Sequence, residues 1–164
     1  MSSAALKVTT PTEREIAITR AFDAPREMVF EALTTPELVK RWLTGPAPWI
    51  MSVCEMDLKV GGAYRYVWTN ASLGKSMGAG GRFVEIARPE RIVSMERFDE
   101  AWYAGEAQVT YTLAESGGKT TLMMTLRYET KETRDMVLRS PMEKGIGISY
   151  DNLNNLLIEL VRKA

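Results

Sequence analysis

Alternation of apolar and polar residues dominates the first three quarters of the chain and predicts a series of β-strands. It appears first at residues 14–22, where Ile16, Ile18 and Phe22 fall on one face. It recurs in later segments, at about 51–59, 63–70, 76–87, 91–98, 106–115 and 119–129. Short turn sequences such as ESGGK separate these segments, so consecutive strands should pair antiparallel in one sheet.

Two short helices are expected after the first strand. In DAPREMVFEAL, Pro25 suits a first helical turn, and Val29, Phe30 and Leu33 form an apolar stripe. The next stretch, TTPELVKRWL, starts a second helix that Thr35 can cap. The chain therefore leaves the first strand through a helix, a break and another helix.

Helical spacing returns at the end of the chain. Thr130 can cap a short segment that runs to about residue 139. Ser140, Pro141 and Glu143 predict a capping box at the start of a long helix over about residues 141–162. Its apolar stripe consists of Ile146, Tyr150, Leu153, Leu157 and Leu160. This helix must bury its stripe on the sheet, which predicts a single α+β domain over residues 13–164 after a flexible tail at residues 1–12.

Four stretches of the chain together resemble a known protein family. They read ITRAFDAPREMVFEALTTPELVKRWL, DLKVGGAYRYVW, GRFVEIARPERIVSMERF and YTLAESGGKTTLMMTLRYE. They look like successive blocks of the Hsp90 ATPase activator homologue-1-like family, which belongs to the START/Bet v 1-like helix-grip superfamily. The resemblance implies a seven-stranded antiparallel sheet wrapped around the C-terminal helix, with two short helices after the first strand. It also implies a cavity between sheet and helix, which often holds an apolar ligand in that superfamily.

The stretch GGAYRYVWTN places Tyr64, Tyr66 and Trp68 on one face of a strand, toward the long helix. Core packing explains such rings most simply, because aromatic residues dominate ordinary cores. The tyrosine hydroxyls and the indole N–H need partners when buried, however, which favours a partly polar cavity. The candidate ligand-binding residues are Trp42, Tyr64, Tyr66, Trp68, Met95, Trp102, Tyr111, Met124 and Tyr150, with Trp42 and Tyr150 expected near the mouth.

Charge and composition limit the kinds of partner that the chain is expected to bind. The 164 residues include 21 Lys or Arg and 21 Asp or Glu, so no overall charge attracts the chain to nucleic acid or an anionic membrane. No apolar run is long enough to span a membrane, and MSSAALKVTTPTE has no apolar core of a signal peptide. A lone cysteine, Cys54, excludes an internal disulfide and is consistent with a cytoplasmic location.

The inventory of reactive side chains argues against catalysis. The chain has no histidine, so Cys54 lacks the usual activating base and is expected to be a small buried apolar residue. We expect no metal and no cofactor, and we identify no catalytic residue. Surface charge explains the acidic residues of the strands most simply, although a buried carboxylate could act as a base. These residues are Glu55, Asp57, Glu85 and Glu96.

Three hypotheses about function remain open. The first is a protein that binds a mainly apolar small molecule in a cavity between the sheet and the C-terminal helix. The second, which the family name suggests, is an Hsp90-type co-chaperone or another protein-interaction module. The third is a cyclase- or hydrolase-type enzyme that uses the same cavity, because one fold can host several functions. The chain is expected to be a monomer or a homodimer.

Overall fold

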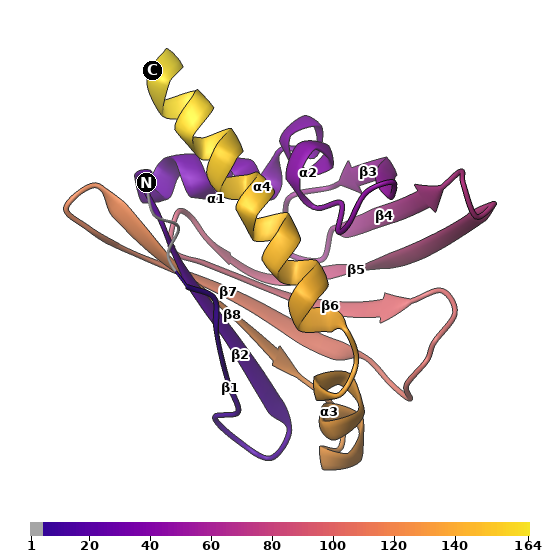
Figure 1. Ribbon diagram of the computed structural model, residues 1–164. Helices are drawn as coiled ribbons and strands as arrows, with labels where there is room; N and C mark the ends of the chain where they lie inside the picture. Colours follow the sequence, from indigo (N-terminus) through magenta and orange to yellow (C-terminus); the bar gives the residue numbers. More distant parts are fainter. Residues whose placement is uncertain (1–4) are drawn as a thin grey trace.

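An eight-stranded antiparallel sheet is the largest part of the structure, a computed structural model that describes residues 5–164 (Figure 1). The strands lie in the order β1-β2-β8-β7-β6-β5-β4-β3. Their bounds are β1 (Lys7–Thr9), β2 (Glu15–Phe22), β3 (Ile50–Met56), β4 (Ala63–Asn70), β5 (Lys75–Ala87), β6 (Arg91–Phe98), β7 (Ala107–Ser116) and β8 (Lys119–Arg127). The last strand of the meander, β8, thus pairs with β2, the first long strand of the chain.

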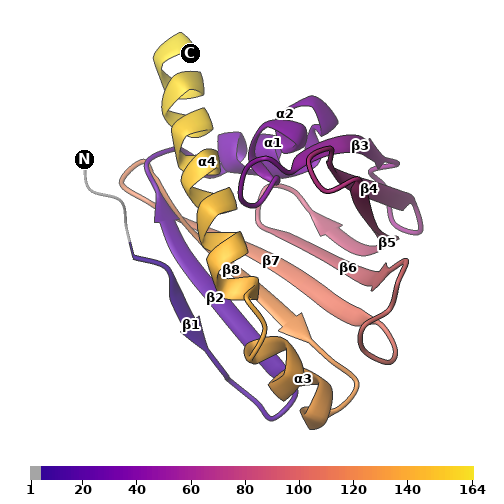
Figure 2. The same cartoon turned by 45° about the vertical axis from the view of Figure 1, so that its right-hand side comes forward.

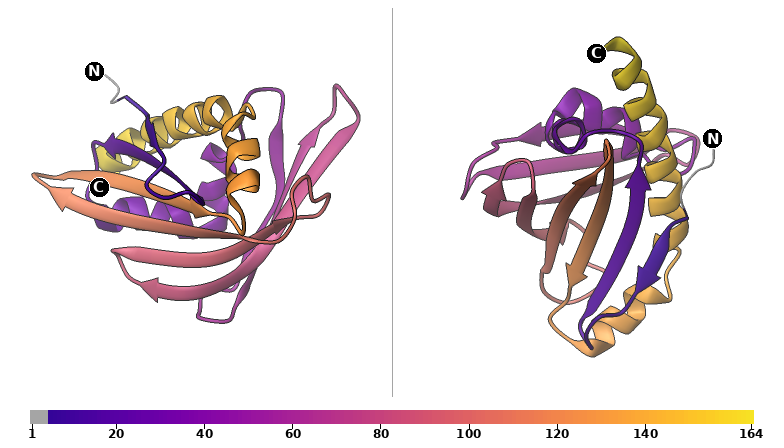
Figure 3. Two further views of the ribbon diagram at one scale, coloured as in Figure 1. Left: turned by 90° about the horizontal axis from the view of Figure 1, so that it is seen from below. Right: turned by 90° about the vertical axis from the view of Figure 1, so that its left-hand side faces the viewer.

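The helices lie on one side of this sheet. They are α1 (Arg26–Thr34), α2 (Pro36–Trp42), α3 (Lys131–Leu138) and α4 (Met142–Lys163). The long helix α4 crosses the face of the sheet, and the sheet curves around it (Figures 2 and 3). This arrangement confirms the α+β class, the helix-grip fold and the two short helices after the first long strand. None of the described helices has the length and apolar character needed to cross a membrane.

The sheet has eight strands rather than the seven expected, because residues 7–9 form β1 inside the segment predicted as a tail. β1 pairs antiparallel with β2, with Val8 opposite Ile18. Val8 is partly buried against the core, so this short strand covers an edge that β2 would otherwise leave open. Three residues are too few to show periodicity in a sequence. Residues 1–4 of the predicted tail lie outside the described residues.

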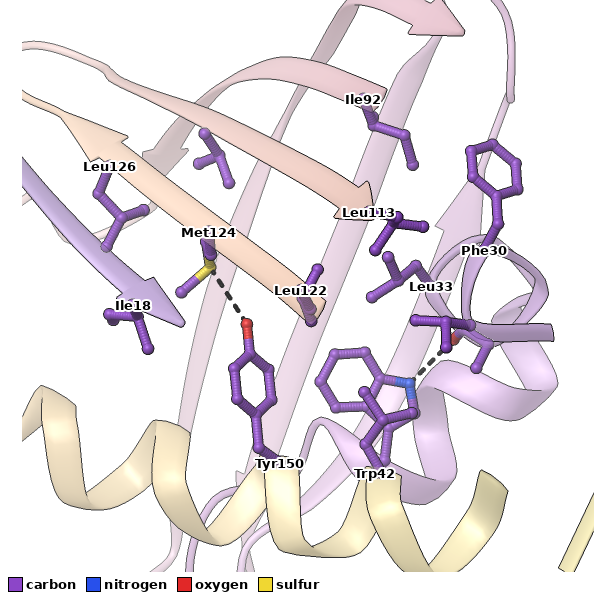
Figure 4. Packing of buried hydrophobic residues seen from close by; sticks show 14 of the residues in the cluster. Ile18, Phe30, Leu33, Trp42, Ile92, Leu113, Leu122, Met124, Leu126 and Tyr150 are labelled. Carbon is purple, nitrogen blue, oxygen red and sulfur yellow. Dashed lines mark hydrogen bonds between the residues drawn. The ribbon is translucent and has the colours of Figure 1, made fainter. Parts of the chain in front are cut away.

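The core forms where the apolar stripe of α4 meets the inner face of the sheet. Tyr150, Leu153 and Leu157 are almost fully buried, as are Ile18 of β2 and Leu122 of β8. Figure 4 shows Tyr150, Ile18 and Leu122 in this core. These positions agree with the stripe predicted from the sequence. The burial of this stripe is what holds α4 on the sheet, since most helical stability comes from packing of the apolar face.

A buried cation also fixes α4 in place. Arg20 is 3% exposed and lies on the inner face of β2, in line with Ile18 and Phe22. Its guanidinium donates a hydrogen bond to the Tyr150 carbonyl and forms an ion pair with Asp151 at 3.3 Å. Because this contact ties the backbone of α4 to β2, it also determines where the Tyr150 ring enters the interior.

The helix starts agree only in part with the expected caps. The Thr130 hydroxyl accepts the Thr133 N–H at 3.1 Å and caps α3, as predicted. The capping box at Ser140 does not form, and α4 begins at Met142 with no side-chain bond from its N-cap. The Ser140 hydroxyl instead donates to the Val137 carbonyl and accepts the Met142 N–H at 3.3 Å. It therefore joins the end of α3 to the start of α4.

Candidate functional site

A cavity of about 210 Å³ lies between α4 and the inner face of the sheet. Strands β4, β6, β7 and β8 supply nine of its nineteen lining residues, and α2, α3, α4, the loop at residues 99–106 and the residues directly after α2 and β8 supply the rest. The lining is largely aromatic or aliphatic. It consists of Trp42, Leu43, Tyr66, Trp68, Glu96, Phe98, Trp102, Tyr103, Ala107, Val109, Tyr111, Met124, Leu126, Tyr128, Val137, Met142, Ile146, Ser149 and Tyr150.

Most of the residues selected from the sequence meet at this cavity. The candidates that line it are Trp42, Tyr66, Trp68, Trp102, Tyr111, Met124 and Tyr150. Tyr64 lies beside a second, smaller space of about 30 Å³, which Tyr66 and Tyr111 also border. Met95 lines neither space, because its neighbours Ser94 and Glu96 face inward and successive side chains of a strand point to opposite faces.

The cavity opens at a different place from the one expected. Trp42 and Tyr150 are 1% and 2% exposed, so they lie at its closed end rather than at a mouth. The Trp42 indole donates to the Ala32 carbonyl at 2.9 Å, and the Tyr150 ring points toward Met124 (Figure 4). Trp102, by contrast, is 43% exposed. We call the side formed by Trp102 and the partly buried Met142 and Ile146 the open end of the cavity.

The three rings of β4 share the inner face, but they differ in their surroundings. Tyr64 packs on Tyr66 with ring centres 5.1 Å apart, and Tyr66 packs on Trp68 at 5.7 Å. Tyr64 is buried and also packs on Phe83, so it is part of the core. Tyr66 and Trp68 border the cavity, and the Trp68 indole donates to the Leu43 carbonyl at 2.8 Å.

Several tyrosine hydroxyls face open space. No fully buried side-chain polar atom lacks a hydrogen-bond partner within residues 5–164. The hydroxyls of four lining tyrosines form no hydrogen bond there, so each must reach a cavity or solvent. These are Tyr66, Tyr103, Tyr111 and Tyr128. Tyr103 and Tyr128 were not predicted from the sequence. Tyr103 lies in a loop, where no periodic pattern shows which way a side chain points, whereas Tyr128 follows the inward-facing Leu126 by two residues and could have been placed inside by alternation.

Glu96 is the acidic residue of the lining, and the expectation that it lies on the surface is wrong. Its carboxylate accepts a hydrogen bond from the Tyr64 hydroxyl at 3.0 Å. Burial raises the pKa of Glu96 above its ordinary value of 4.5, and the Tyr64 bond lowers it in part. Alternation with Ile92 and Ser94 could have placed it inside. The other acidic residues of that prediction, Glu55, Asp57 and Glu85, are exposed as expected.

A glycine makes the contact between Tyr64 and Glu96 possible. Tyr64 lies opposite Gly81 of β5, which lies opposite Glu96 of β6, so the three positions form one row across the sheet. A Cβ atom on Gly81 would lie 3.0 Å from the Tyr64 hydroxyl and 1.8 Å from the Met95 carbonyl oxygen. The bare backbone of Gly81 therefore leaves room for the tyrosine to reach across it.

The remaining titratable groups of the site stay uncharged at neutral pH. Burial, together with a smaller contribution from the nearby Glu96 carboxylate, raises the pKa of Tyr103 to about 12. Burial also raises the pKa of Tyr111, with a smaller contribution from Glu96. None of the described lining residues is a lysine or an arginine. Cys54 is buried outside this cavity, as expected, and burial raises its pKa to about 11.

The sequence matches the family model described as Activator of Hsp90 ATPase homolog 1-like protein over residues 23–157. The chain belongs to this family. The match includes both short helices, the strands from β3 to β8 and most of α4. It therefore covers every element that lines the cavity. No curated protein matches the sequence significantly.

Solved structures of bacterial proteins share this fold across nearly their full lengths. A Rhodobacter sphaeroides protein is 32% identical, with a TM-score of 0.87 over 94% of this chain and 98% of that one. A Chromobacterium violaceum protein, CV1439, is 28% identical, with a TM-score of 0.76 over 89% and 98% of the two chains. Protein NE0264 from Nitrosomonas europaea is 23% identical, with a TM-score of 0.80 over 92% and 98%, and shows the fold alone. This member of the activator-homologue-like family thus has the architecture of those structures.

Proposed function

We propose that the protein binds a mainly apolar small molecule in the cavity between α4 and the sheet. The observation that carries this proposal is the cavity of about 210 Å³, walled by aromatic rings and containing a few polar groups. Binding sites for small molecules are typically concave and apolar, with a small number of polar groups that orient the ligand.

The size of the cavity supports a ligand rather than ordinary packing. Protein interiors are close-packed and contain few voids larger than a water molecule. An unfilled space of this size costs stability through the contacts that its walls do not make. The walls also contain Tyr103 and Tyr128, whose hydroxyls have no hydrogen-bond partner in the described chain. A ligand would fill the space and offer partners to these groups.

Two measurements test the proposal. Native mass spectrometry of the purified protein looks for a retained small molecule, and titration with the neutral fluorescent probe N-phenyl-1-naphthylamine measures access to the cavity. The decisive variant is Ala107→Leu, because Ala107 is a small buried residue of the lining. The control is Ala114→Leu, which makes the same change on the same strand at an exposed position.

We expect the probe to bind the wild type and the Ala114→Leu variant equally and to bind Ala107→Leu at least several-fold more weakly. Circular dichroism checks that each variant is folded. Val109→Phe also fills the cavity and replaces Ala107→Leu if the latter does not fold. Equal probe affinity for the wild type and a folded cavity-filling variant would show that the probe binds elsewhere and would overturn the proposal.

A further inference from the structure

We propose that the cavity selects ligands that carry one cationic amine on an aromatic or otherwise apolar body, with the Glu96 carboxylate as the counter-ion of the amine. This inference rests on the proposed function and adds the chemical class of the ligand. It follows from the position of Glu96, from the groups that surround it and from the positive charges that are missing there.

Glu96 is placed so that its carboxylate can receive a ligand. It lines the cavity and also borders the smaller space beside Tyr64. The Tyr64 hydroxyl donates to Oε2 at 3.0 Å and fixes the orientation of the carboxylate. An ionised carboxylate can accept about four hydrogen bonds, and Tyr64 supplies the only one found within residues 5–164. Most of its acceptor capacity is therefore available to a ligand.

The protein supplies no positive charge to this carboxylate. No lysine or arginine lines either space, and Glu96 takes part in no ion pair within the described chain. A buried charge is costly unless it is paired, so the missing cation is a property that a ligand can provide. A ligand carboxylate would instead meet like charge and would be rejected.

The rings around Glu96 favour the same kind of ligand. Trp102 packs edge-on against Phe98 and Tyr103, with ring centres 6.5 and 5.2 Å away. Tyr103 in turn packs edge-on against Tyr128 at 5.4 Å. Aromatic faces attract cations, and tyrosine oxygens accept hydrogen bonds from an ammonium group. This aromatic corner lies at the open end, where Trp102 is exposed and a ligand can enter.

Three matched probes test the inference: 2-naphthylmethylamine, 2-naphthylmethanol and 2-naphthoate. They share one apolar body and differ in carrying a cation, a neutral donor or an anion. For the wild type at pH 7 we expect the amine to bind about tenfold or more tightly than the alcohol, because the ammonium group adds a charge–charge attraction to the carboxylate that the hydroxyl lacks. The carboxylate probe should bind more weakly than the alcohol.

Glu96→Gln separates the charge from the shape of the site. In this variant the ratio of amine affinity to alcohol affinity should fall to near one, because the charge–charge attraction that favours the amine is removed. The control is Glu55→Gln, which removes the same charge from the exposed face of β3 and should change neither affinity. Tyr64→Phe, which releases the carboxylate, should reduce the advantage of the amine in part and serves as a second variant.

The pH dependence gives an independent readout. The titratable groups that face Glu96 are all tyrosines with raised pKa values, so Glu96 is the group of the described lining whose protonation changes as the pH is lowered from neutral. They are Tyr64 and Tyr66 of β4, Tyr103 of the 99–106 loop, Tyr111 of β7 and Tyr128 beyond β8. As acid protonates Glu96, affinity for the amine should fall by more than affinity for the alcohol, because only the amine loses a charge–charge attraction.

The outcomes distinguish this inference from the proposed function. If amine and alcohol bind the wild type equally, or if Glu96→Gln keeps the preference for the amine, the inference is wrong and the binding function stands. If none of the three probes binds and N-phenyl-1-naphthylamine does not bind either, the proposed function itself fails.

Discussion

The two tryptophans Trp42 and Trp68 offer a matched test of whether the cavity is real in solution. Each indole donates one hydrogen bond to a backbone carbonyl, at 2.9 Å for Trp42 and 2.8 Å for Trp68. Truncation to alanine therefore removes one such bond in either case, and this loss cancels in the comparison. Both rings border the cavity, but Trp42 is 1% exposed whereas Trp68 is only partly buried.

The expected magnitudes follow from these differences in burial. Trp42→Ala should lower the free energy of unfolding by about 3–5 kcal/mol, because an almost completely buried indole is replaced by a void. Trp68 already faces open space on one side, so Trp68→Ala should cost roughly half as much, about 2 kcal/mol. The difference between these two losses is larger than the error of a denaturation experiment. Each loss is also a large part of the total free energy of unfolding of a small domain.

Urea unfolding followed by far-ultraviolet circular dichroism measures both losses without relying on tryptophan fluorescence. Trp42→Phe and Trp68→Phe provide a milder pair if the alanine variant of Trp42 does not fold. Binding of N-phenyl-1-naphthylamine should change in the Trp68 variant, because that ring is part of the cavity wall. Equal stability losses for the two positions, together with unchanged probe binding, would show that Trp68 is plain core and would refute the reasoning.

Three further predictions concern Glu96, Gly81 and Cys54. The raised pKa of Glu96 means that the folded protein holds this proton more tightly than the unfolded chain, so the free energy of unfolding should fall as pH rises above about 4.5. In the Glu96→Gln variant the free energy of unfolding should fall less over this pH range. Urea unfolding that gives the same pH dependence for the wild type and the variant would contradict this. Gly81→Ala should destabilise the fold by about 1–3 kcal/mol, because the new Cβ would clash with the Met95 carbonyl. Gly145→Ala is the control: its Cβ would meet free space in α4, so this variant should stabilise the fold by about 0.5–1 kcal/mol, as measured by thermal unfolding. Cys54 should react with dithiodipyridine at pH 8 far more slowly than a free thiol in peptide form, because burial raises its pKa to about 11, and reaction at the peptide rate would disprove its burial.

The fold was largely predictable because each strand buries one face. A period of two along the sequence then reports the strand directly, and the predicted limits 63–70 and 91–98 coincide with β4 and β6. The long helix was predictable for the same reason, since its stripe of apolar residues repeats with the helical period. β1 was not predicted, because three residues are too few to show a period of two. Its pairing with β2 depends on an edge that exists only in the folded sheet.

The candidate site was predictable only where alternation and residue type agree. Tyr66 and Trp68 are aromatic and face inward, so the sequence alone placed them at the helix side of the sheet. Glu96 also faces inward by this alternation. Glutamate is normally exposed, however, and for that reason the sequence analysis wrongly placed Glu96 on the surface. Its burial depends on Tyr64, which contacts it across Gly81 from two strands away.

The sequence by itself determined which residues form strands and helices and which face of each one is apolar, because these properties depend on neighbours along the chain. Tertiary structure alone decided the size of the cavity and the position of its open end. The loop that carries Trp102 and Tyr103 has no periodic pattern, and only its packing against Phe98 and Tyr128 brings it to the cavity. Trp42 and Tyr150 lie at the closed end because α2 and α4 pack together there, a contact between segments more than 100 residues apart.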